Sequence, residues 1–106
     1  MHILFICSKN RWRSLTAETI FKNNTNHEIK SAGTDEGARI KVTEKHLIWA
    51  DKIFVMEKKH KQIIAMKFPA AVAQREIIVL DIPDEYTYMD EDLILMLNAA
   101  MEPYIE

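Results

Sequence analysis

Cysteine is almost absent from the sequence, which contains one, Cys7, among 106 residues. A single cysteine excludes an intrachain disulfide framework and a four-cysteine zinc site, and it fits a reducing compartment. No apolar run approaches the ~20 residues of a membrane span. The N-terminal residues also lack the basic start and small-residue cleavage site of a secretory signal. We therefore expect a soluble protein of the cytoplasm that makes no membrane contact.

An excess of charge of one sign is also missing, because 14 basic and 16 acidic residues give a net charge of −2. Such a chain has no overall field that attracts nucleic acid or an anionic membrane, so any anion must bind at a local site. The four histidines share no metal-ligand spacing, and we expect packing or surface roles for them. We expect EKKHK, residues 57–61, to be a solvated helix start, although His60 in it could approach the loop after the first strand. The sequence thus predicts neither a metal site nor a cofactor.

What the sequence does contain is a regular alternation of short apolar runs and helix-forming stretches. The expected strands cover residues 2–6, 28–34, 51–57 and 76–82, and the expected helices cover residues 13–24, 43–50, 58–68 and 90–105. Thr43 and Asp90 are the expected N-caps, and Pro69 is expected to stop the third helix. The alternation predicts a single α/β domain over residues 1–106. Its three layers are a four-stranded parallel sheet and helices on both faces of that sheet.

Cys7 stands where ligands bind in such sheets, at the carboxyl end of the first strand. It begins CSKNRWRS, residues 7–14, which leads into the first helix. The free N–H groups of a helix start bind anions and favour a thiolate. Arg13 offers a planar guanidinium that matches two phosphate oxygens, Asn10 tolerates the positive φ of a tight turn, and Ser14 can donate to a thiolate or cap the helix. Residue type alone favours a buried core thiol, but this context favours a phosphate site.

The segment ILFICSKNRWRSLTAETIF, residues 3–21, resembles the phosphate-binding loop and first helix of the low-molecular-weight protein tyrosine phosphatases. The pattern in that family is an apolar strand, Cys-x-x-Asn-x-x-Arg-Ser, and a helix that begins with small residues, alanine and glutamate. The resemblance continues in order through IKSAGT (29–34), WADKIFVME (49–57) and IPDEYTY (82–88). It is closest to a short bacterial branch of predicted tyrosine phosphatases. It implies the flavodoxin-like strand order of the phosphotyrosine phosphatase I fold.

The resemblance implies a two-step phosphoryl transfer from a phosphorylated protein or a small aryl phosphate, with inorganic phosphate as a product. Cys7 would attack phosphorus as a thiolate and form a phosphocysteine, while Arg13 and the loop N–H groups hold the equatorial oxygens. A carboxylic acid would protonate the leaving oxygen and then, as carboxylate, activate water. No metal or other cofactor is required, since the loop itself neutralises the phosphate. The residues implied to bind phosphate are Ser8, Lys9, Asn10, Arg11, Trp12, Arg13 and Ser14.

The candidate acids lie in VLDIPDEYTYMDED, residues 79–92, where the family carries Asp-Pro followed by aromatic residues. Asp84 matches the family position better, although the proline that should follow it is absent. Asp81, right at the expected end of the fourth strand, is the alternative acid. Tyr86 and Tyr88 could form a wall beside an aromatic phosphoester, or they could be half-buried loop residues.

Two residues of the loop depart from the family pattern. Lys9 stands where glycine is usual and would be strained if the position needs a positive φ. Trp12 replaces a second cysteine that is common there, so Cys7 has no resolving partner. These departures keep three functions open: a hydrolase of phosphotyrosine or aryl phosphates, a non-catalytic phosphate or phosphoprotein-binding module, and a thiol-dependent arsenate reductase. The sequence identifies neither the natural substrate nor the oligomeric state.

Overall fold

The computed structural model of the protein describes residues 1–23 and 25–105. Its sheet has four parallel strands in the order β2-β1-β3-β4. The strands are β1 (His2–Cys7), β2 (Glu28–Gly33), β3 (Lys52–Val55) and β4 (Glu76–Val79). This is the flavodoxin-like order, with its topological switch point between β1 and β3. The predicted fold class is therefore confirmed.

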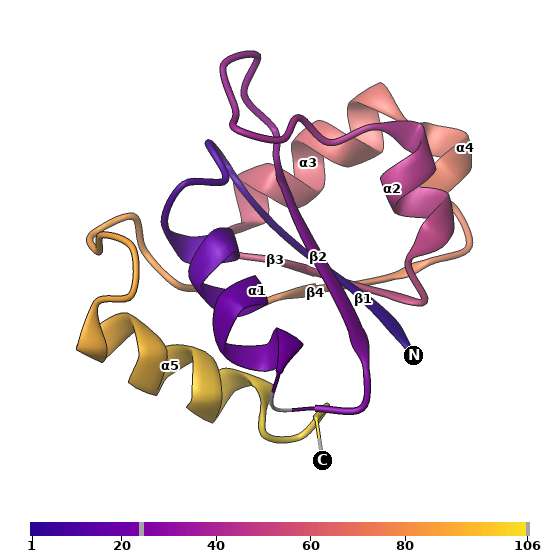
Figure 1. The fold of residues 1–106 in the computed structure, drawn as a ribbon. Coiled ribbons are helices and arrows are strands. Elements are labelled where there is room, and N and C mark those ends of the chain that lie inside the picture. The colour runs from indigo at the N-terminus through magenta and orange to yellow at the C-terminus, as the bar shows by residue number, and fades with distance from the viewer. Residues whose placement is uncertain (24, 106) are drawn as a thin grey trace.

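Five helices cover the sheet in the part of the chain that the structure describes. They are α1 (Arg13–Lys22), α2 (Glu44–Trp49), α3 (Lys58–Lys67), α4 (Pro69–Val72) and α5 (Glu91–Met101). Helices α1 and α5 pack together on one face, and α2, α3 and α4 lie on the other, which gives the predicted three layers (Figure 1). The end of the first predicted helix, residue 24, lies outside the described residues. Within the described ranges, no helix is both long and apolar enough to cross a membrane.

Strand β1 is the centre of both cores. Ile3, Phe5 and Cys7 point into the cluster that includes residues of α1 and α5, and Leu4 and Ile6 point into the cluster on the opposite face. Because successive side chains of a strand alternate between faces, a strand covered on both sides needs apolar residues throughout. That burial holds the last residue of β1, Cys7, at a fixed position beneath the loop that follows it.

The two predicted N-caps are confirmed. The Thr43 hydroxyl accepts from the His46 N–H, and the Asp90 carboxylate accepts from the Asp92 N–H. Pro69, in contrast, does more than stop α3. It begins α4, a short helix that was not predicted, because a proline has no N–H to leave unpaired and suits the first turn of a helix.

Strand β4 ends at Val79, three residues before the predicted boundary of 82. The chain still runs beside β3, since the Leu80 N–H donates to Val55 O and the Ile82 N–H donates to Met56 O, both at 2.9 Å. Between them Asp81 adopts a left-handed φ of 57°. That conformation interrupts the pleat and turns the chain away from the sheet.

Candidate active site

Residues 7–14, which we call the Cys7 loop, connect β1 to α1 at the carboxyl edge of the sheet. Among the non-glycine residues that the structure describes, positive φ angles occur at Asn10 (55°), Asp81 (57°) and Met89 (62°). Lys9 is not one of them. The tight turn thus falls on asparagine, which tolerates it, and the lysine in place of the usual glycine introduces no left-handed strain.

The sulfur of Cys7 is surrounded by hydrogen-bond donors. It lies 2.9 Å from Ser14 Oγ, and the Asn10 N–H donates to it at 3.3 Å. The Asn10 side-chain amide donates to Ser14 Oγ and to Ser31 Oγ, both at 2.8 Å. Because Ser14 Oγ accepts from Asn10, its own proton is available for the sulfur, and the competing acceptor, Ala32 O, is farther away at 3.4 Å. The Ser14 hydroxyl and the Asn10 N–H thus both direct a proton at the Cys7 sulfur.

The backbone carbonyls of residues 7–10 are all engaged by the segment 34–39, which follows β2. The bonds run from Thr34 N to Cys7 O at 3.0 Å, from Asp35 N to Ser8 O at 2.9 Å, from Arg39 N to Lys9 O at 2.9 Å and from Arg39 Nε to Asn10 O at 3.1 Å. Carbonyl oxygens held in this way cannot turn toward a bound anion. The segment 34–39 therefore acts as a clamp that sets the orientation of the loop.

Gly33 allows the clamp to approach the loop. A Cβ at this position would lie 2.5 Å from Ser8 O and 2.7 Å from Ala38 Cβ, distances that real Cβ atoms do not reach. One of the two glycines of the chain is thus required for close packing rather than for a turn, since β2 must pass directly under the loop.

Arg13 is buried, with 2% of its side chain exposed. Its Nη1 donates to Ile82 O at 2.8 Å and to Glu57 Oε1 at 2.5 Å, and its Nε lies 3.8 Å from Asp84 Oδ1. Burial alone would raise the pKa of Glu57, but the hydrogen bond and charge of Arg13 outweigh burial and leave that pKa below its ordinary value. The guanidinium is held on one edge by the segment that follows β4 and by the N-cap residue of α3, so its orientation is set by the fold.

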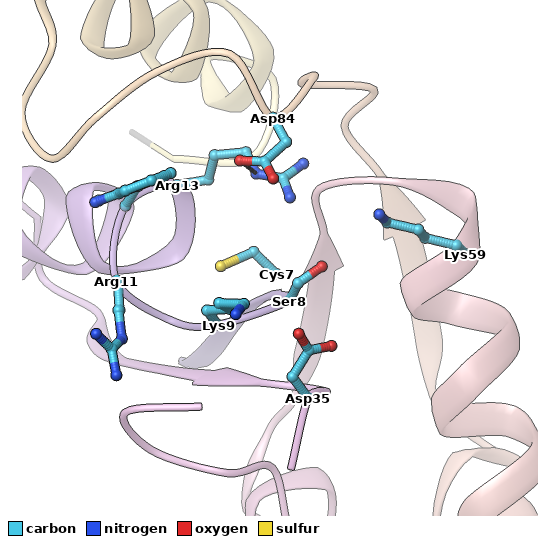
Figure 2. Close-up of a pocket in the computed structure, with 9 residues that line it drawn as sticks. Cys7, Ser8, Lys9, Arg11, Arg13, Asp35, Lys59 and Asp84 are labelled. Carbon is cyan, nitrogen blue, oxygen red and sulfur yellow. Dashed lines mark ion pairs between the residues drawn. The ribbon is translucent and has the colours of Figure 1, made fainter. Parts of the chain in front are cut away.

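A cavity of about 260 Å³ opens above the Cys7 loop (Figure 2). It is lined by Cys7, Ser8, Lys9, Arg11, Trp12, Arg13, Asp35, Lys59 and Asp84. The chain as a whole has a net charge of −2, yet four basic and two acidic side chains line this cavity. The sequence predicted that any anion must bind at a local site, and this basic cavity is the candidate.

Most of the predicted site residues meet at this cavity, but not all in the same way. Asn10 and Ser14 are fully buried and support the loop from behind. Asp84, whose side chain is 52% exposed, reaches the cavity, whereas Asp81 is absent from its lining and faces an adjoining groove with Glu85. The structure thus places the first-choice acid near Cys7 and the alternative outside.

The two tyrosines do not line the cavity. Tyr86 packs against the α1–α5 core, and the Tyr88 hydroxyl is 3.0 Å from Thr19 Oγ1. Tyr86 fits the second of the two expectations, a half-buried loop residue, whereas Tyr88 is 46% exposed and fits neither. The aromatic side chain that does line the cavity is Trp12, which is 45% exposed.

Three acidic or basic residues near the cavity were not predicted as site residues. Asp35 and Lys59 line it, and Glu57 holds Arg13. A signal was present in the sequence, because Asp35 and Glu57 each stand two residues after a strand. The carboxyl ends of neighbouring parallel strands meet at one edge, so such residues gather there.

The expectation of a solvated helix start at residues 57–61 is wrong for one residue, His60, which has 0% of its surface exposed. Its Nδ1 accepts from the Glu57 N–H at 3.0 Å, and its Nε2 lies 2.9 Å from Ser8 Oγ. Burial, and next the positive charge of Arg13, lower the pKa of His60 to about 4. The ring therefore ties the start of α3 to the Cys7 loop as a neutral group.

We expect His60 to make the fold sensitive to mild acid. The unfolded chain binds a proton at this residue below about pH 6.5, but the folded protein does not until about pH 4, so stability is lost as the pH falls through this window. The wild type should lose about 2 kcal/mol of unfolding free energy between pH 7 and pH 5 from this group. His60→Gln, which has no titratable ring, should lose less over the same interval in urea titrations. Equal losses in both proteins would contradict the assignment.

The doubly wound sheet carries Cys-x5-Arg between its first strand and its first helix, the pattern on which the resemblance to the phosphatase family rests. Residues 2–48 match the family model described as low molecular weight phosphotyrosine protein phosphatase. The resemblance noted in the sequence is confirmed, and the chain is low-molecular-weight-phosphatase-like in fold and in the sequence of this N-terminal part. No curated protein sequence matches the chain.

Solved structures show the same fold over nearly the whole chain. The tyrosine phosphatase Wzb from Escherichia coli K30, in complex with phosphate, is 23% identical with a TM-score of 0.77, over 97% of this chain and 94% of that one. The tyrosine phosphatase amsI from Erwinia amylovora is 19% identical with a TM-score of 0.74, over 97% and 89%. The YwlE arginine phosphatase from Geobacillus stearothermophilus is 24% identical with a TM-score of 0.69, over 96% and 84%.

Proposed function

We propose that this single domain is a phosphoester hydrolase that acts on phosphotyrosine in proteins, or on small aryl phosphates, through a phosphocysteine intermediate. The observation that supports this most directly is the surroundings of the Cys7 sulfur. It receives hydrogen bonds at the floor of a basic cavity that Arg13 and Asp84 also line. A core thiol would need neither these donors nor access to a cavity.

In the first step, the Cys7 thiolate attacks phosphorus and the bond from phosphorus to the leaving oxygen breaks. Arg13 and the loop N–H groups stabilise the equatorial oxygens, and Asp84 gives its proton to the leaving alcohol. In the second step, the Asp84 carboxylate takes a proton from water as the water oxygen attacks phosphorus. The sulfur–phosphorus bond breaks, inorganic phosphate is released, and the thiolate is restored.

The lining of the cavity favours an aryl group on the phosphate. Trp12 offers an aromatic face, and Wzb and amsI are both named tyrosine phosphatases. YwlE is named an arginine phosphatase, but Lys9 and Arg11 in this cavity would repel the guanidinium of a phosphoarginine. The mechanism needs a free thiol, and a reducing compartment such as the cytoplasm fits that need.

The proposal is tested by hydrolysis of 4-nitrophenyl phosphate, with phosphotyrosyl and phosphoseryl peptides compared under the same conditions. We expect turnover that inorganic phosphate inhibits competitively, and a several-fold preference for phosphotyrosine because its ring can pack on Trp12. Phosphate binding measured by calorimetry without turnover would instead establish a binding module. Arsenate reduction with added thiol, but no phosphoester hydrolysis, would establish the reductase.

A further inference from the structure

The buried ring of His60 contacts one side chain of the Cys7 loop, that of Ser8. We propose that the Ser8 hydroxyl is a direct ligand of the bound phosphate, and that His60 is the positioning residue that turns this hydroxyl into a donor. The inference rests on the proposed function, since it adds a ligand to the same phosphate site. The inference concerns the side chain of Ser8. The proposed function uses only the backbone N–H groups of the loop.

The hydrogen bonds of His60 fix which ring nitrogen carries the proton. Nδ1 faces the Glu57 N–H at 3.0 Å, and a backbone N–H can only donate, so Nδ1 must accept. The proton of the neutral ring is then on Nε2, which lies 2.9 Å from Ser8 Oγ. A charged ring would carry a proton on Nδ1 as well and would oppose the Glu57 N–H. His60 therefore donates to Ser8, and the direction of that bond is set by α3.

Ser8 is left with a proton to donate. A hydroxyl has one donor and two acceptor sites, and here His60 occupies one acceptor site. The Ser8 hydroxyl makes no other hydrogen bond with residues 1–23 or 25–105. Ser8 lines the cavity beside Cys7, on the side that faces α3 (Figure 2). A phosphoryl oxygen above Cys7 is the acceptor that this proton lacks.

The other serine of the loop, Ser14, has its hydroxyl oriented in the same way. Asn10 donates to Ser14 Oγ at 2.8 Å and leaves the Ser14 proton for the Cys7 sulfur. In each case a buried donor occupies the hydroxyl oxygen and directs its proton toward the reacting atoms. The Ser14 hydroxyl would donate a hydrogen bond to the nucleophile, and the Ser8 hydroxyl would donate one to the phosphate.

A matched pair of His60 variants distinguishes its contact with Ser8 from its contact with the Glu57 N–H at the start of α3. His60→Asn places an oxygen near the Nδ1 position, so it keeps an acceptor for the Glu57 N–H but cannot reach Ser8. His60→Gln places its amide nitrogen near the Nε2 position, so it keeps a donor to Ser8 and loses the bond to Glu57. Ser8→Ala removes the proposed ligand, and Ser8→Thr retains a hydroxyl.

The measurement is the Kd of inorganic phosphate by titration calorimetry, which does not depend on turnover. We expect Ser8→Ala to weaken phosphate binding by about 10- to 100-fold, the usual effect of a hydrogen bond to a charged group. His60→Asn should weaken it by a similar factor, and His60→Gln and Ser8→Thr should restore most of the affinity. The double variant Ser8→Ala/His60→Asn should be no weaker than Ser8→Ala, because both changes remove one interaction.

Two results would overturn the inference. Phosphate affinity within about 2-fold of wild type in Ser8→Ala would show that the hydroxyl is not a ligand. A greater loss in His60→Gln than in His60→Asn would show that His60 acts only through the start of α3. Circular dichroism of each variant establishes that it is folded. Failure of hydrolysis with these binding results intact would reject the proposed hydrolase and leave the Ser8 ligand standing.

Discussion

Cys7→Ser should reduce hydrolysis of 4-nitrophenyl phosphate by at least about 10⁴-fold, the scale on which enzymes lose activity when their nucleophile is removed. The substitution replaces sulfur by oxygen at a position that is 3% exposed, so it changes chemistry more than shape. A hydroxyl at the same position is not ionised near neutral pH and cannot replace the thiolate. The measurement is the initial rate with a product assay at 405 nm, at saturating substrate.

Phosphate binding provides the control for this variant. Arg13 and the loop backbone are unchanged in Cys7→Ser, and the clamp of segment 34–39 does not involve the sulfur. Phosphate should therefore still bind. Wild-type protein quenched in acid during turnover should carry one phosphate on Cys7, detectable by mass spectrometry. Substantial turnover in Cys7→Ser would rule out the thiolate mechanism, whatever the phosphate affinity.

Asp84→Asn should lower kcat by about 10²- to 10⁴-fold, because the leaving oxygen then departs without a proton donor. Asp84 lines the cavity, and its carboxylate is 3.8 Å from Arg13 Nε. The loss should be larger for phosphotyrosine, whose phenol has an ordinary pKa of about 10, than for 4-nitrophenyl phosphate, whose leaving group is far more stable as an anion. The dependence on leaving group distinguishes a lost acid from a distorted cavity.

Asp81→Asn is the matched control, three residues away in the same loop. Asp81 is exposed and absent from the cavity lining, so its variant should keep kcat within about 3-fold of the wild type. Asparagine also tolerates the left-handed φ of 57° at this position. A large loss in Asp81→Asn together with a small one in Asp84→Asn would exchange the two assignments.

The sequence predicted those features that depend on local pattern. Strand β1 is apolar after its first residue because both of its faces are covered, and that pattern is visible in residues 3–6. The positive φ of Asn10 follows from the preferences of asparagine in a tight turn. The place of Cys7 follows from the rule that ligands bind at the carboxyl ends of parallel strands.

Features that depend on which strand ends lie side by side were not predicted. His60 sits among lysines, a solvated pattern in sequence, and its approach to the loop was only an alternative. The packing of α3 against β3 and β4 buries it, and its ring lies beside Ser8. Trp12 was considered as the replacement of a second cysteine and as part of the phosphate-binding loop, and the tyrosines were candidates for a wall or for half-buried loop residues. The orientation of their side chains depends on how α1 and the 80–90 loop meet, and no local pattern contains that information.

The clamp links the site to one edge of the sheet. Segment 34–39 continues directly from β2, an edge strand that pairs with β1 on one side and is bridged on its outer side at Gly33, by hydrogen bonds with Ile40 and Val42. Edge elements open more readily than the centre of a sheet, in fluctuations far smaller than global unfolding. When β2 detaches, the carbonyls of the Cys7 loop lose their partners while β1 and α5 remain packed. Fraying at one edge of the sheet would thus let the Cys7 loop lose its phosphate-binding conformation while the rest of the protein stays folded.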